Sequence, residues 1–314
     1  MDAEGAKRAI LEEARRAGFD RVGVAPAHVP PEESERLAAW LADGMHGTME
    51  WMKSRAPLRT DPSRLLPGAR SVVVAAAEYE SAEPGAPAGR ARISRYALGR
   101  DYHEVLRAML RKVESAAREL LAGAKTRSFV DSAPVLEKMY AQRAGIGWRG
   151  KHSNVIVPGG GSWFFLGGFL IDHELPADAP STDRCGSCRA CIDACPTGAI
   201  VRPYVVDGSR CISYLTIEHR GAVDDELARG SGEWVFGCDI CQEVCPWNRF
   251  ARGTRLPDLK ARRDVAGLTL ERARTLGRAG FERMFRGTPV LRAGWERFRE
   301  SVERAIRNRE REVE

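Results

Sequence analysis

The stretch Cys185-Gly-Ser-Cys188-Arg-Ala-Cys191-Ile-Asp-Ala-Cys195-Pro196 decides how this chain is organised. Its spacing, Cys-x2-Cys-x2-Cys-x3-Cys-Pro, is the bacterial ferredoxin run, in which three thiolates bind one [4Fe-4S] cubane and the fourth reaches a second cubane. The run therefore predicts a small ferredoxin-type domain that carries two clusters.

A second run, Cys238-x2-Cys241-x3-Cys245-Pro246, repeats the spacing without its first cysteine, and Cys211 is the thiol left to replace it. Because the last cysteine of each run serves the other cluster, the ligands divide into two sets. We expect Cys185, Cys188, Cys191 and Cys245 on the first cluster and Cys195, Cys211, Cys238 and Cys241 on the second. Paired Cys-x2-Cys motifs also suit structural zinc, which is the alternative reading.

All eight cysteines lie between Cys185 and Cys245 in a chain of 314 residues. A reducing cytoplasm favours metal over disulfides for such a cluster. The composition, 43% apolar with mean hydropathy −0.36, is typical of a soluble globular protein. The longest apolar run, Val155–Ile171, is broken by Pro158 and five glycines, and the N-terminus lacks the apolar part of a signal peptide. We therefore expect a cytoplasmic protein with no membrane partner.

Hydrophobic periodicity predicts an α/β layer before the cysteines. An amphipathic helix containing Ile10, Leu11 and Ala14 leads to the first strand. The further expected elements are strands over Arg21–Ala25, Ser71–Ala77 and Arg127–Asp131, a loop over Pro84–Gly89, a helix over Tyr102–Leu121, and a hairpin of Lys151–Val157 with Ser162–Ile171 across Pro-Gly-Gly-Gly.

The proline- and acid-rich stretch Leu175–Asp183 is a plausible boundary, so we predict an α+β or α/β multidomain protein with parts 1–175, 176–250 and 251–314. The last part holds 17 basic residues against 10 acidic ones, whereas the first 250 residues are nearly neutral. This asymmetry favours an anionic partner such as nucleic acid. The alternative is a solvated amphipathic helix with an apolar face formed by Leu291, Trp295, Phe298, Val302 and Ile306.

The cysteine-free first part is about three times longer than the roughly 60 residues that a two-cluster domain needs, so we expect it to hold whatever receives the electrons. It contains neither a P-loop nor a strand followed by G-x-G-x-x-G, which argues against nicotinamide. Asp101-Tyr-His103 resembles the start of a cobalt-ligating histidine motif, but Leu106 stands where that motif needs glycine. We therefore predict a surface or helix-capping role for His103, and core positions for Trp148 and Trp163.

Seven strings, in order along nearly the whole chain, resemble the epoxyqueuosine reductase family. They are Arg55-x3-Arg59-x-Asp61-Pro62, Val130-Asp-Ser-Ala-Pro-Val-Leu-Glu-Lys138, Gly145-Ile-Gly-Trp-Arg-Gly-Lys151, Gly161-Ser-Trp-Phe-Phe-Leu-Gly167, Cys211-Ile-Ser-Tyr-Leu-Thr-Ile-Glu218, Phe236-Gly-Cys-Asp-Ile-Cys-Gln-Glu-Val-Cys-Pro-Trp-Asn248 and Phe285-Arg-Gly-Thr-Pro289. The resemblance implies a cobalamin-dependent enzyme that reduces epoxyqueuosine to queuosine at the wobble base of tRNA. It also implies a cobalamin-binding α/β domain, a ferredoxin-type domain and a short helical, HEAT-like C-terminal segment.

By the same resemblance Asp131 donates the proton to the epoxide oxygen, and its place at a strand end is where α/β domains bind ligands. The competing interpretation makes Asp131 or Ser132 an ordinary helix N-cap, with Pro134 just inside the helix. We expect burial beside the cofactor to raise the pKa of Asp131. The predicted cobalamin contacts are Arg55, Tyr96, Asp131, Val155, Leu166 and Ser213, while Arg55 and Arg59 could instead meet tRNA phosphates or solvent.

The resemblance further implies a monomer that takes electrons from a low-potential donor such as flavodoxin or ferredoxin. Two rival functions are a reductive dehalogenase and an electron-transfer subunit. The first usually carries a twin-arginine export signal, and Arg15-Arg16 lacks the apolar segment that would follow one. The second leaves the large cysteine-free domain without a use.

Overall fold

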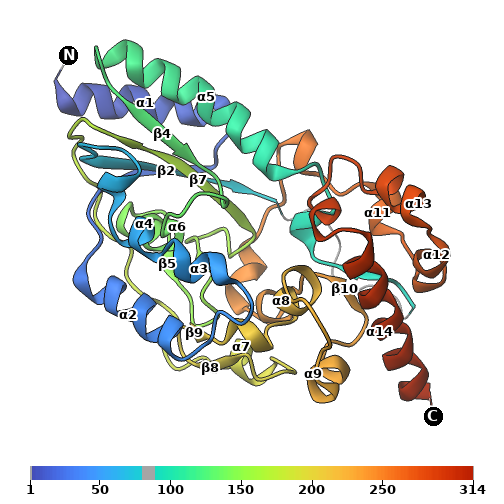
Figure 1. The fold of residues 1–314 in the computed structure, drawn as a ribbon. Helices are drawn as coiled ribbons and strands as arrows, with labels where there is room; N and C mark the ends of the chain where they lie inside the picture. The colour runs from blue at the N-terminus through green and yellow to red at the C-terminus, as the bar shows by residue number, and fades with distance from the viewer. Residues whose placement is uncertain (1, 80–88, 314) are drawn as a thin grey trace.

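The computed structural model describes residues 2–79 and 89–313 and centres on an antiparallel sheet (Figure 1). The sheet has four strands in the order β1-β2-β7-β4, and each neighbouring pair is antiparallel. Their bounds are Arg21–Pro26 for β1, Ser71–Glu78 for β2, Phe164–Ile171 for β7 and Thr126–Phe129 for β4. Of the two expected classes, α+β and α/β, the antiparallel sheet with its helices fits α+β.

Helices cover both faces of this sheet (Figure 1). Helices α1 (Ala3–Ala17) and α5 (Tyr102–Leu120) pack on one face, where their apolar residues join those of β2 and β7 in one core. Helix α6 (Glu137–Arg143) covers the other face. Every residue of β2 is buried, which explains its unbroken apolar run. The predicted first helix is confirmed. The bounds of β1, β2 and β4 agree with the predicted strands to within two residues.

The predicted hairpin is wrong, although both of its arms contain strand. Strand β6 (Val155–Ile156) pairs with β5 (Trp148–Arg149), whereas β7 pairs with β2 and β4. An isolated bridge pairs Val157, at the end of the first arm, with Gly161 of the connecting Pro-Gly-Gly-Gly. The cause lies in Pro-Gly-Gly-Gly: Gly159 and Gly161 have φ of 69° and 78°, so they close a tight loop instead of continuing a ladder. The predicted loop Pro84–Gly89 lies almost wholly outside the described residues.

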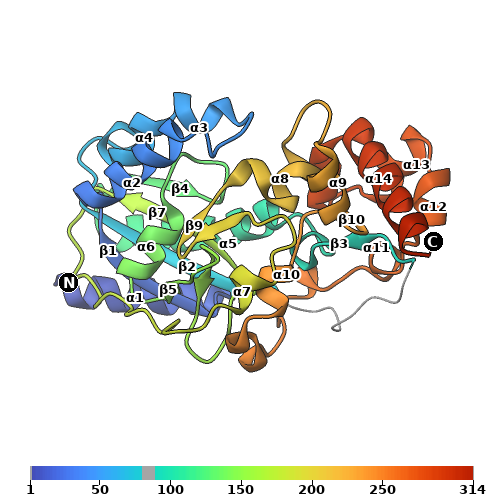
Figure 2. The ribbon, with the colours of Figure 1, turned by 90° about the horizontal axis from the view of Figure 1, so that it is seen from below.

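The cysteine-bearing segment is built from short elements (Figure 2). These are α7 (Ala190–Asp193), β8 (Ile200–Arg202), β9 (Val205–Val206), η3 (Gly208–Arg210), α8 (Ile212–Ile217), α9 (Asp225–Gly230), β10 (Trp234–Phe236), α10 (Ile240–Glu243) and η4 (Pro246–Phe250). Four more short helices, between β1 and β2, are α2 (Pro31–Ala42), α3 (Glu50–Ser54), α4 (Ala56–Thr60) and η1 (Pro62–Arg64).

A second core joins the C-terminal helices to a segment from the first part of the chain. Strand β3 (Arg92–Ile93), followed by η2 (Arg95–Ala97), pairs in parallel with β10. The helices are η5 (Pro257–Leu259), α11 (Arg263–Ala266), α12 (Leu270–Thr275), α13 (Arg278–Met284), η6 (Pro289–Ala293) and α14 (Trp295–Val313). Phe298 and Val302 are buried as the apolar face of α14 predicts. Leu291 is instead exposed, because it lies in η6 before α14 begins.

The carboxylate of Asp239 fastens the cluster segment to the chain before α5. It is buried and accepts hydrogen bonds from Ser94 Oγ and from the backbone N–H of Arg95, the latter at 2.8 Å. Burial raises the pKa of Asp239 to about 6. Within the described residues, no helix has the length and apolarity that a membrane span requires.

We expect Phe169→Ala to lower the free energy of unfolding by about 3–5 kcal/mol, because Phe169 is fully buried in β7 and its loss leaves a cavity. Phe250→Ala is the matched control, since Phe250 is 39% exposed. Urea unfolding of both variants measures the difference. Equal losses would show that the sheet core does not dominate stability.

Candidate active site

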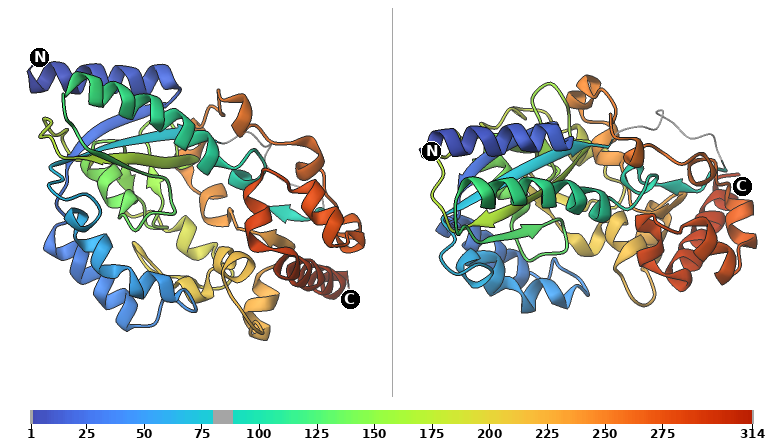
Figure 3. Two further views of the ribbon diagram at one scale, coloured as in Figure 1. Left: turned by 45° about the horizontal axis from the view of Figure 1, so that its top comes forward. Right: turned by 90° about the horizontal axis from the view of Figure 1, so that it is seen from above.

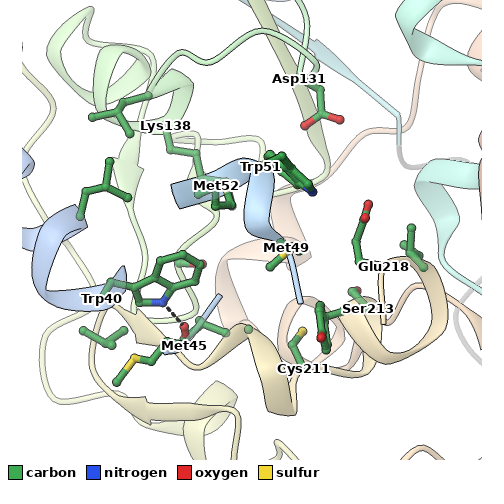
Figure 4. A pocket seen from close by; sticks show the side chains of 18 of the residues that line it. Trp40, Met45, Met49, Trp51, Met52, Asp131, Lys138, Cys211, Ser213 and Glu218 are labelled. Carbon is green, nitrogen blue, oxygen red and sulfur yellow. Dashed lines mark hydrogen bonds between the residues drawn. The ribbon is translucent and has the colours of Figure 1, made fainter. Parts of the chain in front are cut away.

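One large cavity lies between the sheet domain and the cluster segment (Figure 4). Its volume is about 1140 Å³. The lining residues come from α2 and α3, the N-terminus of α5, the loop before α6, strand β9, helix α8 and η6. Many of the lining side chains are apolar or aromatic, including Trp40, Met45, Met49, Trp51 and Met52. A cavity at the upper end of the usual size range for small-molecule sites can accept a large organic group.

The backbone is held in an unusual conformation at this cavity. Among the described residues, Asp131, Ser153 and Tyr204 are the non-glycine residues with positive φ, at 55°, 66° and 69°. All three line the cavity. Left-handed conformations cost free energy for side-chain-bearing residues, and they gather at functional sites. The cavity is thus marked as a site by its backbone as well as by its size.

The eight cysteines are free thiols in the structure. Burial, and then the nearby Cys245, Cys185 and Cys188, raise the pKa of Cys191 to about 11. Burial likewise raises the pKa of Cys241, with Cys211 as the next largest cause and Cys191 and Cys195 also contributing. Burial raises the pKa of Cys238 as well, with Cys241 and Cys211 adding to it. Because Cys191 also acts on Cys241, these interactions do not divide the thiols cleanly, and the two ligand sets stay a prediction.

Side chains from the sheet domain hold the cysteine loops in place. Lys151, buried at the end of the Gly145–Lys151 string, donates from Nζ to the carbonyl oxygens of Gly186 and Cys188 at 2.6 and 2.8 Å. Asn154 Nδ2 donates to Gln242 Oε1 at 2.7 Å, and Gln242 lies beside Cys241. Cys188 itself is exposed at the surface.

Cys211 and Asp131 lie at opposite sides of the cavity (Figure 4). Cys211 is the N-cap residue of α8 and lines the cavity, as does Ser213 two residues later. A cysteine of the second predicted set therefore stands directly at the cavity, whereas Asp131 faces it from the sheet side. A group bound between them would have this cysteine on one side and the Asp131 carboxylate on the other.

Asp131 follows β4 but caps no helix. Strand β4 ends at Phe129, and the next helix, α6, begins at Glu137 with Leu136 as its N-cap residue. The N-cap interpretation of Asp131 or Ser132 is therefore wrong. Instead the Asp131 backbone N–H donates to Glu137 Oε1 at 2.6 Å, which fixes the turn and leaves the Asp131 carboxylate free for the cavity.

Two neighbours on the first turn of α5 bind the Asp131 carboxylate. Tyr102 Oη donates to Asp131 Oδ2 at 2.8 Å, and His103 Nε2 lies 3.3 Å from the same oxygen. His103 Nδ1 lies 2.7 Å from Asp101 Oδ1. The Arg292 guanidinium is 2.8 Å from His103 Nε2. An Asp-His-Asp series thus runs from the N-cap of α5 into the cavity.

In this structure the pKa of Asp131 is lowered, and the rise expected from burial beside a cofactor stays a prediction. Burial acts to raise the pKa, but the hydrogen bonds from His103 and Tyr102 and the charges of His103 and Arg292 outweigh it and lower the pKa. The side chain is still 62% exposed, because it stands in the open cavity although protein surrounds its base. The pKa of His103 is raised: burial lowers it, but the hydrogen bonds to Asp101 and Asp131 prevail.

The surface role predicted for His103 is also wrong. His103 is buried and lines the cavity, with only 4% of its side chain exposed. The sequence feature that could indicate this role is the string Asp101-Tyr-His103, which places a carboxylate two residues before the histidine. Tyr102, Arg292 and Lys138 are further cavity residues that the sequence did not single out.

Of the predicted cobalamin contacts, Tyr96, Asp131 and Ser213 line the cavity. Val155 and Leu166 instead pack in the core beneath α6, and neither is a lining residue. Arg55 is exposed at the end of α3, outside the lining set. Arg59 is 7% exposed and lies over the ring of Trp51, 5.3 Å from its centroid. Trp148 and Trp163 are buried, which confirms their core positions.

Two family models match the chain. One, described as epoxyqueuosine reductase QueG, DUF1730, matches residues 59–132, and a 4Fe-4S double cluster binding domain matches residues 184–248. The epoxyqueuosine reductase of Xanthomonas campestris is 43% identical over 96% of this chain and 86% of its own length.

Solved structures of the same family have the same fold. A crystal structure of epoxyqueuosine reductase with an epoxyqueuosine-modified tRNA-Tyr stem loop matches with a TM-score of 0.89 and 29% identity over 97% of this chain and 82% of that one. The Bacillus subtilis enzyme, with its catalytic loop swung out of the active site, matches with a TM-score of 0.89, 30% identity and the same coverage.

His103→Gln should destabilise the protein more at about pH 5.5 than at about pH 8.5. A raised histidine pKa adds stability that is present below the unfolded-state pKa of about 6.5 and is lost as pH rises through the folded-state pKa. Thermal unfolding at the two pH values measures the change. Tyr102→Phe removes a neighbouring hydrogen bond without a group that titrates in this range, so its cost should be the same at both. An equal cost of His103→Gln at both pH values would contradict the histidine charge.

Proposed function

The chain belongs to the epoxyqueuosine reductase family, and on that premise we propose that it reduces the epoxide of epoxyqueuosine in tRNA to queuosine. The observation that carries the proposal is the placement of Cys211 and Asp131 on opposite sides of one large cavity. The reaction takes two electrons and two protons: both carbon–oxygen bonds of the epoxide break, a carbon–carbon double bond forms, and the oxygen leaves as water. An oxidoreductase with this chemistry needs an electron path and a proton path to one point.

We further propose that the cavity holds cobalamin, which supplies a strongly reducing cobalt centre when bound. The residues present fit such a group. The volume suits a macrocycle, and the methionine side chains of Met45, Met49 and Met52 adapt to an irregular apolar partner. Tyr96 and Ser213 would contact it from the cluster side of the cavity.

The cysteine arrangement supports a second part of the proposal, two [4Fe-4S] clusters with the ligand sets given above. Each cluster passes one electron at a time, so two clusters suit a two-electron reduction. With these ligand sets, the second cluster would lie at the cavity, which Cys211 lines, and the first would lie nearer the surface, where Cys188 is exposed. We propose that a low-potential protein such as flavodoxin or ferredoxin delivers electrons at that surface.

The chain's own residues would handle the proton at Asp131. In the open cavity Asp131 is ionised at neutral pH, since its pKa is lowered. A substrate that fills the cavity removes water from the carboxylate, which raises its pKa. Arg292 can only donate to His103 Nε2 in this arrangement, so His103, with its raised pKa, could pass a proton from Nε2 to Asp131 Oδ2 once Arg292 moves away, while Asp101 holds the imidazole in position at Nδ1. Tyr102 keeps the carboxylate pointed at the cavity.

The remaining proposals concern the setting of the enzyme. We propose that the protein acts in the cytoplasm, where its tRNA substrate is found. We also propose that it acts as a monomer. The division into parts 1–175, 176–250 and 251–314, the last of them HEAT-like, stays a prediction, although residues 91–98 pack with the C-terminal helices.

Anaerobic reaction with epoxyqueuosine-containing tRNA, cobalamin and a low-potential donor, followed by nucleoside mass analysis, tests the function. Absence of queuosine with intact clusters would refute it.

Asp131→Asn should lower turnover at least about 100-fold, because the amide keeps the size but carries no transferable proton. Asp172→Asn, the same chemical change at the far end of β7, serves as the matched control and should turn over normally. Cobalamin binding, followed by visible absorption, should persist in both variants. A normal rate for Asp131→Asn with bound cofactor would assign the proton to another group.

Cys211→Ser should remove the second cluster and leave the first, so iron analysis should give about four irons per chain instead of about eight. Electron paramagnetic resonance of the reduced protein should then show one cluster without its coupling partner. Full iron content in this variant would show that Cys211 is not a ligand.

A further inference from the structure

A second, smaller pocket lies against helix α14, on the other side of a short loop from the active-site cavity. Its volume is about 360 Å³. Helix α14 and the segment from Gly221 to Ala228 form its walls, and α9 and α14 lie side by side in Figures 1 and 2. Four arginines line it, against two acidic residues: Arg297, Arg304, Arg307 and Arg311 against Asp225 and Glu300.

Two of these arginines are buried without full hydrogen bonding. Arg297 and Arg304 are 6% and 5% exposed, and neither Nε has a hydrogen-bond partner among the described residues. Glu300 lies 3.2 Å from one nitrogen of Arg297, and Arg304 Nη2 donates to Ser301 Oγ at 3.2 Å. Arg304 therefore has no carboxylate partner within the described part of the chain. Burying an unpaired cation costs several kcal/mol in general, so such a site calls for an anion.

Positive charges and one carboxylate act on both cations. Burial, and then the charges of Arg297 and Arg307, lower the pKa of Arg304 to about 10, while Glu300 acts to raise it. Burial also lowers the pKa of Arg297, with Glu300 acting to raise it and Arg220 to lower it. The fold keeps this cluster together by other means: Asn308 Nδ2 donates to the carbonyl oxygens of Ala228 and Gly232 at 2.8 and 3.0 Å. The pocket is therefore preformed and does not need the anion to assemble.

The position of the pocket indicates which anion it receives. Glu218 and Arg220 line the active-site cavity, and Gly221, Ala222 and Val223 line the arginine pocket. One short loop thus borders both the active-site cavity and the arginine pocket. In Figure 3 the chain around residue 220, in gold, runs close to the dark red C-terminal helix. A polynucleotide that inserts one base into the cavity must carry its backbone past this loop. Guanidinium groups bind phosphate oxygens in pairs, which suits a backbone phosphate.

We propose that Arg297, Arg304 and Arg307 form a specific binding site for one backbone phosphate of the tRNA whose modified base enters the cavity. The inference rests on the proposed function for its choice of RNA. The sequence predicts only that the basic C-terminal segment attracts nucleic acid, whereas this proposal assigns one preformed site to one phosphate. Because phosphates carry no base identity, the site fixes the position of the RNA and leaves recognition of the base to the cavity.

Binding measurements on an anticodon stem loop test the site. Arg304→Met and Arg307→Gln should each weaken binding about 10-fold, the effect of one lost charged hydrogen bond. Arg299→Gln is the matched control, because Arg299 lies on the same helix outside the pocket and its side chain is 56% exposed. The slope of log affinity against log salt should fall by about one for the two pocket variants and stay unchanged for the control. Equal behaviour of pocket and control variants would overturn the site.

Thermal unfolding without RNA distinguishes a ligand site from a structural role of Arg304. Arg304→Met removes a buried unpaired charge and keeps the volume, so we expect its unfolding midpoint to rise. A lower midpoint would mean that Arg304 holds the fold together, and the proposal would fail.

The two proposals fail separately. A stem loop with guanine at the wobble position should lose as much affinity on Arg304→Met as the epoxyqueuosine stem loop does. If the wild-type protein binds both RNAs through the arginines yet forms no queuosine, the proposed function is wrong and the phosphate site stands. If it forms queuosine while the pocket variants bind normally, the phosphate site is wrong.

Discussion

The buried carboxylate of Asp239 is the contact on which the active-site arrangement depends. It stands beside Cys238 in the cluster segment and accepts hydrogen bonds from Ser94 and Arg95, just before α5. Helix α5 in turn carries Tyr102 and His103 to Asp131. One carboxylate therefore sets the distance between the electron-carrying and proton-carrying sides of the cavity. The parallel pairing of β3 with β10 also joins the chain before α5 to the cluster segment.

Local chemistry made part of this structure predictable. The cysteine spacing predicts a two-cluster domain, and the match of residues 184–248 to a 4Fe-4S double cluster binding domain confirms it, while the ligand sets stay a prediction. The amphipathic first helix and the buried run of β2 are also local patterns, and both hold. The family resemblance pointed to Asp131, which the cavity contains.

Long-range pairing made the rest unpredictable. Val130-Asp-Ser-Ala-Pro matches a helix N-cap, yet Glu137 takes the Asp131 N–H and holds the turn open. The glycines after Pro158 resemble a hairpin turn, but the strand that follows finds better partners in β2 and β4. His103 carries no sign in the sequence that Asp131, 28 residues later, will lie beside its ring. Each error arises where a tertiary contact outweighs a local preference.

The environment of Asp131 separates the resting state from the working state. A carboxylate held ionised by a histidine and a tyrosine keeps the open cavity polar and hydrated. Removal of that water by a substrate strengthens every charge interaction inside. On the proposed mechanism the proton would move only when the cavity is filled, which would protect a reducing centre bound there from wasteful proton reduction.

The exposure of the loop around Cys188 would make a cluster bound there sensitive to oxidation. Lys151 anchors this loop through two carbonyl oxygens, but Cys188 remains exposed. With the proposed ligand sets, a surface that lets a donor protein approach the first cluster also lets dioxygen approach it, whereas Cys238 and Cys241 of the second set are less exposed than Cys188. Oxidative damage should therefore begin at the first cluster and cut the electron supply before it harms the site of reduction.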